Sequence, residues 1–174
     1  MTSDTSAKES ERTRFGALLQ QHRGIVLKVA GTYCRNPADR EDLAQEIAEQ
    51  LWRSFPSFDS GRTFSTWMYR VALNVAISSV RSRGVRERHT VALDDSIDVV
   101  DENAADPETD ESIALLHAFI GRLDRLSRAL LLLYLDERSH REIADVLGIT
   151  ETNVATKISR LKRRLREETD NGTR

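Results

Sequence analysis

The apolar residues of this chain recur at intervals of three and four along most of its length, which is the period of an α-helix. Strand signals, such as strict alternation of apolar and polar residues, are almost absent. With 174 residues, the chain has room for one ordinary domain or two small ones. The pattern therefore predicts an all-α fold, and a lapse of the period in the middle of the chain divides it in two.

Three helices are expected before this lapse. The first runs over residues 13–34, the second begins at Pro37, and the third covers residues 65–83. Asn36 is a favourable N-cap for the second helix, Pro37 suits its first position, and acidic residues crowd its positive end. Three helices of this size close a small bundle. The expected core residues are Phe15, Leu18, Leu19, Ile25, Val26, Val29, Leu43, Ile47, Leu51, Phe55, Trp67, Met68, Val71 and Val75.

Charge is strongly segregated, although the formal net charge is only −2. Residues 1–88 have an excess of four basic residues, residues 89–111 hold nine Asp or Glu and no Lys or Arg, and residues 112–174 have an excess of three basic residues. The acidic segment lacks helical periodicity and contains a proline, so we interpret it as a linker that either docks as an extended strap or acts as a solubilising spacer.

Residues 139–165 have the pattern of a helix-turn-helix, at the end of a second domain with four expected helices. Ser139 can cap a short helix, Gly148 suits a left-handed turn, and Thr150 can cap the next helix. That last helix has an apolar stripe from Val154 to Leu165, and its other face is polar and basic. A helix of this kind fits the major groove of DNA. The alternative is an ordinary bundle helix with a solvated basic face; the combination of features favours DNA binding.

Three segments indicate which class of DNA-binding protein this is. Residues 39–55, "DREDLAQEIAEQLWRSF", resemble the polymerase-binding segment of bacterial sigma factors. Residues 58–83 resemble the adjoining promoter-melting segment, and residues 123–149 are similar to the start of the upstream-element-binding domain. The chain is thus identified as a member of the sigma-70 family, extracytoplasmic-function (ECF) group.

The resemblance implies a domain order along the chain. It implies a disordered N-terminal tail (residues 1–12), sigma region 2 as a bundle of three to four helices (13–88), an acidic linker (89–111), sigma region 4 as a four-helix domain with the helix-turn-helix (112–169), and a C-terminal tail (170–174). In this group, the linker lies in polymerase channels that nucleic acid later occupies, so an acidic strap could mimic that polyanion.

The resemblance also assigns roles to residues. Core-polymerase binding is expected at Asp39, Asp42, Gln45, Glu46 and Glu49. Recognition and melting of the −10 element are expected at Ser60, Arg62, Thr63, Phe64, Arg70, Asn74, Ser78 and Arg81, with Arg83, Arg86 and Arg88 extending the cationic path. Recognition of the −35 element is expected at Thr152, Asn153, Ala155, Thr156, Lys157, Ser159, Arg160, Arg163 and Arg164.

Some assignments stay open at the level of sequence. For Trp67 a core position is preferred, and for Phe64 the residues favour neither the core nor the site. The reading helix departs from the family pattern, because Ala155 stands where many members have a cation and Ser159 where an aromatic residue is frequent. Asn153 could instead read an adenine edge through its amide. Promoter choice is therefore expected to depend on residues 152–155.

The expected partners are core RNA polymerase, through its β′ clamp helices and β flap, and promoter DNA. Many members of the group are held inactive by an anti-sigma factor, which adds such a protein as a candidate partner. The runner-up function is a stand-alone helix-turn-helix regulator with an N-terminal sensor bundle, which would dimerise and bind duplex DNA by itself.

An enzymatic function has little support. His22, His89, His117 and His140 show no metal-ligand spacing, no phosphate-binding loop is present, and the lone cysteine, Cys34, lies at the end of an apolar helix where packing is favoured over reactivity. No catalytic residue, metal, cofactor or small-molecule substrate is expected. The polar N-terminus does not resemble a secretory signal, and no apolar run approaches the roughly 20 residues of a membrane span. We therefore expect a cytoplasmic protein that joins the nucleoid when it is bound to polymerase.

Overall fold

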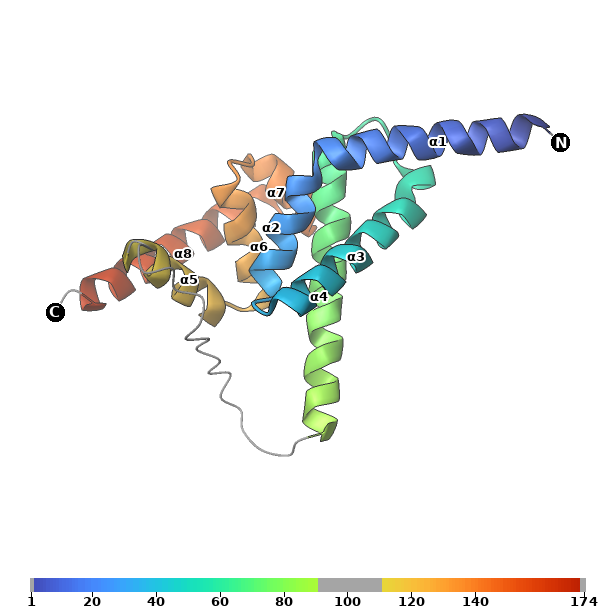
Figure 1. Cartoon of the computed structure of the whole chain (residues 1–174). Coiled ribbons are helices and arrows are strands. Elements are labelled where there is room, and N and C mark those ends of the chain that lie inside the picture. Colours follow the sequence, from blue (N-terminus) through green and yellow to red (C-terminus); the bar gives the residue numbers. More distant parts are fainter. Residues whose placement is uncertain (1, 91–110, 173–174) are drawn as a thin grey trace. The chain divides into compact units, whose positions relative to one another are not determined.

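The computed structural model describes residues 2–90 and 111–172, in which all regular structure is helical (Figure 1). Side chains are described for residues 8–79, 115–168 and 170. The elements are α1 (Thr2–Gln21), α2 (Arg23–Tyr33), α3 (Pro37–Ser54), a 3₁₀ turn η1 (Phe55–Ser57), α4 (Phe64–Thr90), α5 (Glu111–Arg122), α6 (Arg125–Leu135), α7 (His140–Leu147) and α8 (Glu151–Gly172). The all-α prediction is confirmed. The chain forms two compact units, the first built on residues 1–80 with 145–148 and the second on residues 81–144 with 149–174. The predicted linker, apart from the ends of α4 and α5, lies outside the described residues.

The expected first helix is in fact two helices, α1 and α2, with a break at His22. The His22 N–H still donates to the Leu18 carbonyl at 3.1 Å, but His22 itself has non-helical dihedral angles, and α2 starts without a side-chain cap. Because this junction has neither a proline nor a capping side chain, the break could not be predicted from the sequence pattern. At its other end, α1 begins at Thr2 and so includes most of the segment expected to be a tail.

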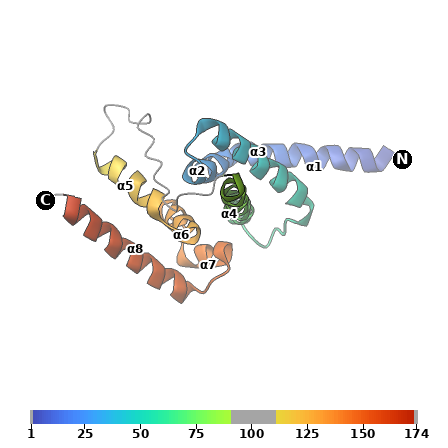
Figure 2. The same cartoon turned by 90° about the horizontal axis from the view of Figure 1, so that it is seen from below.

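Helix α3 begins as predicted. The Asn36 side chain accepts hydrogen bonds from the backbone N–H groups of Ala38 (2.8 Å) and Asp39 (3.4 Å), and Pro37 occupies the first turn. These bonds satisfy amides that have no partner inside the helix. α3 packs along α2 (Figure 2), and the expected inward residues Leu43, Ile47 and Leu51 are fully buried.

The core face of α4 differs from the expected one. Met68 is buried as predicted, but Trp67, Val71 and Val75 are only half-buried. The other apolar α4 residues in the core are Phe64, Tyr69, Ala72, Leu73 and Ala76. Apolar residues occur nearly all round the first part of this helix, so its periodicity did not determine which face packs inward. α4 is also longer than expected, and the side chains of its residues 80–90 lie outside the described ones.

The four helices predicted for the second domain are present as α5 to α8, and the two caps predicted there, Ser139 and Thr150, are confirmed. At the start of α7, the Glu142 N–H donates to the Ser139 hydroxyl (3.2 Å), and the Ser139 N–H donates back to the Glu142 carboxylate (2.9 Å). This capping box lowers the pKa of Glu142, mainly through the backbone hydrogen bond from Ser139. Thr150 caps α8 by accepting from the Asn153 N–H at 3.2 Å.

The core of this unit joins α6 and α8, which pack against each other. Its fully or nearly fully buried side chains include Phe119, Leu123, Ala129, Leu130, Leu133, Ile143, Val154, Ile158 and Leu161. On α7, Ile143 and Ala144 are buried as expected, but Val146 is buried where Leu147 was expected. Leu147 and the predicted plug Ile149 are half-buried instead.

Gly148 fixes the angle between α7 and α8, because its φ of 67° lies in the left-handed region. A Cβ there meets no heavy atom within 4 Å, so the penalty for alanine is conformational.

We expect Gly148→Ala to lower the free energy of unfolding by about 1–2 kcal/mol, measured by urea unfolding of the full chain. Gly31→Ala is the matched control. This glycine is helical, its nearest neighbour is Arg40 Nε at 3.9 Å, and alanine there should stabilise by roughly 0.5–1 kcal/mol. Equal effects of the two substitutions would contradict this role of Gly148.

Candidate functional site

An acidic stripe runs along the exposed face of α3. The expected polymerase-binding residues Asp39, Asp42, Gln45, Glu46 and Glu49 are all exposed. From position 42 onward their spacing of three and four places them on one side of the helix, opposite the buried Leu43, Ile47 and Leu51. Glu49 forms an exposed i,i+4 pair with Arg53 (3.4 Å), which is a weak interaction that a partner could displace. We call these five residues the acidic stripe.

An aromatic cluster holds the loop between η1 and α4. The rings of Phe55, Phe58, Phe64 and Trp67 lie 5.1–6.4 Å apart between centroids, mostly in edge-to-face or tilted arrangements. Phe15 adds an edge contact to Phe55 at 5.1 Å. The ring of Phe64 also lies 5.4 Å from His22, and only 9% of Phe64 is exposed. Phe64 therefore fixes the loop by packing beneath its surface in the aromatic cluster, and it exposes little area that a base could contact. Trp67, for which the core was preferred, is a half-buried member of the cluster.

The loop itself, residues 58–63, presents polar side chains. Ser60, Arg62 and Thr63 are exposed. Asp59 shapes the loop, because its carboxylate accepts the Gly61 N–H at 2.9 Å. Thr63 caps α4 by accepting the Thr66 N–H (3.3 Å), and its hydroxyl lies 2.8 Å from that of Thr66. The roles of Asp59 and Thr66 were missed at the level of sequence, although an Asp two residues before a glycine is a recognisable turn signal.

Helix α4 carries a second exposed stripe. Arg70, Asn74 and Ser78 are exposed and four residues apart, so they lie on one side of the helix. Arg81 was predicted to continue this stripe, but its side chain lies outside the described residues, as do those of Arg83, Arg86 and Arg88.

Helix α8 presents a polar face opposite its buried stripe of Val154, Ile158 and Leu161. The predicted reading residues Thr152, Asn153, Ala155, Thr156, Ser159, Arg160, Arg163 and Arg164 are exposed, and Lys157 is half-buried. The cationic side chains of this face differ in how freely they could contact DNA. The Arg164 guanidinium lies 5.9 Å from the centre of the Phe119 ring, whereas Arg163 makes only an exposed contact with Glu167 at 3.8 Å.

Comparison with known proteins assigns these surfaces to a family. The sigma-70 region 2 family model matches residues 18–86, and the sigma-70 region 4 model matches residues 113–165. This chain belongs to the sigma-70 family. Family members are RNA polymerase initiation factors rather than enzymes. The region 2 match contains the acidic stripe, the loop and the α4 stripe, and the region 4 match contains α7 and most of α8.

Named relatives place the chain in the ECF group of this family. The ECF sigma factor SigW of Bacillus subtilis is 25% identical over 92% of this chain and 91% of its own length. CnrH, a sigma factor of Cupriavidus metallidurans solved with the cytosolic domain of CnrY, has the same fold (22% identity, TM-score 0.67, covering 96% of this chain and 94% of CnrH). RpoE of Bartonella quintana, solved with the anti-sigma factor NepR, is also similar in fold (19% identity, TM-score 0.62, covering 90% and 94%).

As a sigma factor, the chain binds RNA polymerase and directs it to promoters. Among the described residues, no helix is both long and apolar enough to cross a membrane. The same part of the chain contains no cluster of three potential metal ligands.

Proposed function

We propose that this sigma factor reads a promoter at two points and melts the downstream one. Residues 13–88 would form the unit that binds core polymerase and the −10 element, and residues 112–169 the unit that binds the −35 element. The observation that carries the proposal is that each family match contains an exposed surface suited to one of these tasks, built from residues that the core does not use. The protein would act in the cytoplasm, where polymerase and chromosome are found.

The acidic stripe is the proposed contact with the β′ clamp helices of core polymerase. Exposed carboxylates on one side of a helix suit a basic helical partner, and complementary charges favour association and fix its register. α3 keeps this stripe rigid because its opposite face is locked into the core by three fully buried residues.

The loop and the α4 stripe are the proposed melting surface. An unstacked base needs hydrogen-bonding groups beside an apolar or aromatic floor. Ser60 and Arg62 supply such groups, and the aromatic cluster supplies the floor. Arg70 and Asn74 on the α4 stripe are suited to phosphates and base edges of the single strand. Because the cluster fixes the loop before DNA binds, little ordering entropy is lost on binding.

The polar face of α8 is the proposed reader of the −35 element. Thr152, Asn153 and Thr156 lie in its N-terminal half, from which a recognition helix reaches base edges. With Ala155 in place of a cation, Asn153 is the residue best suited to direct readout, by a bidentate contact with adenine. This arrangement would give the factor its own promoter preference.

Arg160→Ala should weaken binding of the polymerase–sigma complex to duplex −35 DNA about five- to tenfold, because a phosphate contact is lost. Lys162→Ala is the matched control on the same helix. The Lys162 ammonium lies 4.6 Å from the Tyr134 ring and faces the protein, so its loss should leave DNA affinity nearly unchanged. Fluorescence anisotropy with labelled duplex measures both variants. Equal losses in the two variants would argue against this face of α8 as the DNA contact.

An anti-sigma factor is a further proposed partner, because the two solved relatives named above each carry a bound protein, and one of these is named as an anti-sigma factor.

One experiment distinguishes the proposed sigma function from the competing one, a stand-alone regulator. A regulator should dimerise and bind duplex promoter DNA tightly by itself, whereas a sigma factor should bind promoters well only with core polymerase.

A further inference from the structure

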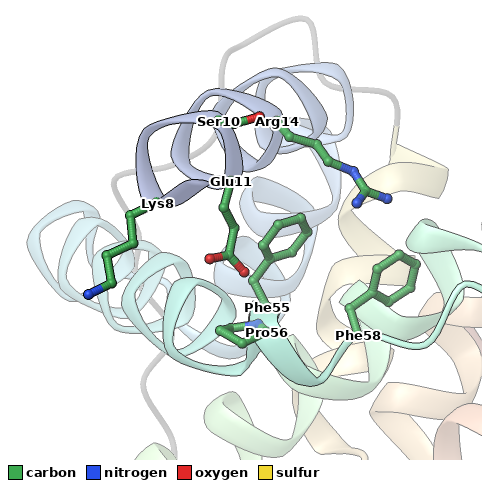
Figure 3. Close-up of a pocket in the computed structure, with 7 residues that line it drawn as sticks. All are labelled: Lys8, Ser10, Glu11, Arg14, Phe55, Pro56 and Phe58. Carbon is green, nitrogen blue, oxygen red and sulfur yellow. The ribbon is translucent and has the colours of Figure 1, made fainter. Parts of the chain in front are cut away.

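A pocket of about 600 Å³ lies between α1 and the turn that precedes the melting loop (Figure 3). Its lining residues are Lys8, Ser10, Glu11, Arg14, Phe55, Pro56 and Phe58. Four of these come from α1, upstream of the region 2 family match, which begins at residue 18. The other three are η1 residues and the first residue of the loop, so the pocket is continuous with the proposed melting surface.

The lining has two chemical parts. One part is flat and apolar, made by Pro56 and by the half-buried ring of Phe58, which is held against Phe55 in a nearly parallel arrangement (interplanar angle 12°). The other part is charged and comes from α1. The Arg14 guanidinium lies 5.9 Å from the centre of the Phe55 ring, and Figure 3 shows the Glu11 carboxylate directed toward Phe55 and Pro56.

We propose that this pocket holds a second unpaired base of the melted strand, one that carries an amino group on its pairing edge. The inference rests on the proposed melting function. Aromatic rings and a guanidinium plane bind the face of a base, and this stacking is a main source of affinity in single-strand binding. With Lys8 and Arg14 against Glu11, the lining of the pocket carries a net positive charge, which suits a ligand linked to phosphates.

Glu11 gives the pocket its selectivity. An ionised carboxylate only accepts hydrogen bonds, so it favours cytosine, adenine or guanine, whose edges carry amino donors. Thymine has no amino group and offers only its ring N3–H, which lies between two carbonyl oxygens that the carboxylate would repel. Phe58 belongs both to the loop and to the pocket. When one base leaves the stack to reach Ser60 and Arg62 in the loop, the next base of the same strand loses a stacking partner and lies near Phe58.

The test measures binding of the full chain, in complex with core polymerase, to short fluorescent oligomers of deoxycytidine and of thymidine. We expect the wild type to prefer the deoxycytidine oligomer, and Glu11→Ala to reduce that preference about three- to tenfold. Arg14→Ala should weaken binding of both oligomers about fivefold or more, and Arg14→Lys should weaken it less because the charge is kept. Arg12→Ala, which removes an exposed α1 cation outside the pocket, should change neither value.

The outcomes separate this inference from the proposed function. If Glu11→Ala and Arg14→Ala leave oligomer binding unchanged while Arg62→Ala in the loop weakens it, the pocket is not a base site and the melting function stands. If Arg14→Ala weakens core-polymerase binding and spares DNA binding, the pocket is a protein contact and the inference is wrong. If no oligomer binds even to the wild-type complex, both proposals fail.

Discussion

Replacing Glu46 and Glu49 together by lysine is expected to lower the affinity for core RNA polymerase about 100-fold, the largest effect that we predict. Both carboxylates are exposed on the acidic stripe, and each replacement puts a like charge against a basic partner, which costs several kcal/mol where the groups are close. The fold should be unaffected, because neither side chain contributes to the core of α3. Co-elution with core polymerase in size-exclusion chromatography, at low and at moderate salt, measures the effect.

Glu41→Lys is the matched control for the acidic stripe. Glu41 is exposed on the same helix and carries the same charge, but it lies at the edge of the stripe, about 80° from Glu49 and about 140° from Glu46 around the helix axis. Its reversal should cause less than about a threefold loss, since a single exposed charge at the edge of an interface interacts weakly. Equal losses for Glu41→Lys and for the double variant would indicate a general charge effect and contradict a defined stripe.

Replacing Arg70 and Asn74 together by alanine should reduce formation of the open promoter complex about 10- to 100-fold while leaving core-polymerase binding intact. The two side chains are exposed on α4 and make no contribution to its core. Their loss removes one phosphate contact and one base-edge contact to the melted strand, which together are expected to contribute about 1.5–3 kcal/mol. Abortive transcription from a linear promoter measures the rate of open-complex formation.

A promoter with a mismatched bubble over the −10 element is the informative control for this second variant. There the strands are already separated, so a variant that is defective mainly in melting should recover most of its activity. Ser79→Ala, on an adjacent side of α4, should behave as wild type on both templates. A double variant that stays equally defective on the bubble template would show that the stripe is needed for something other than melting.

The features that could be predicted from the sequence are those determined locally. The caps at Asn36, Ser139 and Thr150 and the left-handed turn at Gly148 depend on residues within one helical turn of each other, and the structure confirms all four. The exposed face of α8 could also be assigned, because Val154, Ile158, Leu161 and Leu165 are the large apolar residues of a mostly polar helix, and the first three are buried.

The features that could not be predicted depend on contacts between distant segments. The apolar residues of α4 cover too much of its circumference for its period to select Tyr69 and Leu73 over Val71 and Val75. Phe64 is buried because His22 and Phe55 contact it from elsewhere in the chain, and nothing next to it in the sequence indicates this. The α1 pocket also depends on a helix that the sequence pattern placed partly in a tail.

The central claim, that the loop of residues 58–63 holds the melted strand, is tested most directly by permanganate reactivity of promoter thymines. With the wild-type polymerase–sigma complex, we predict reactive thymines around the −10 element and protection of the −35 element. With Ser60→Ala combined with Arg62→Ala, reactivity should be lost while the −35 element stays protected, because α8 is unchanged. Undiminished thymine reactivity with the double variant would contradict the account.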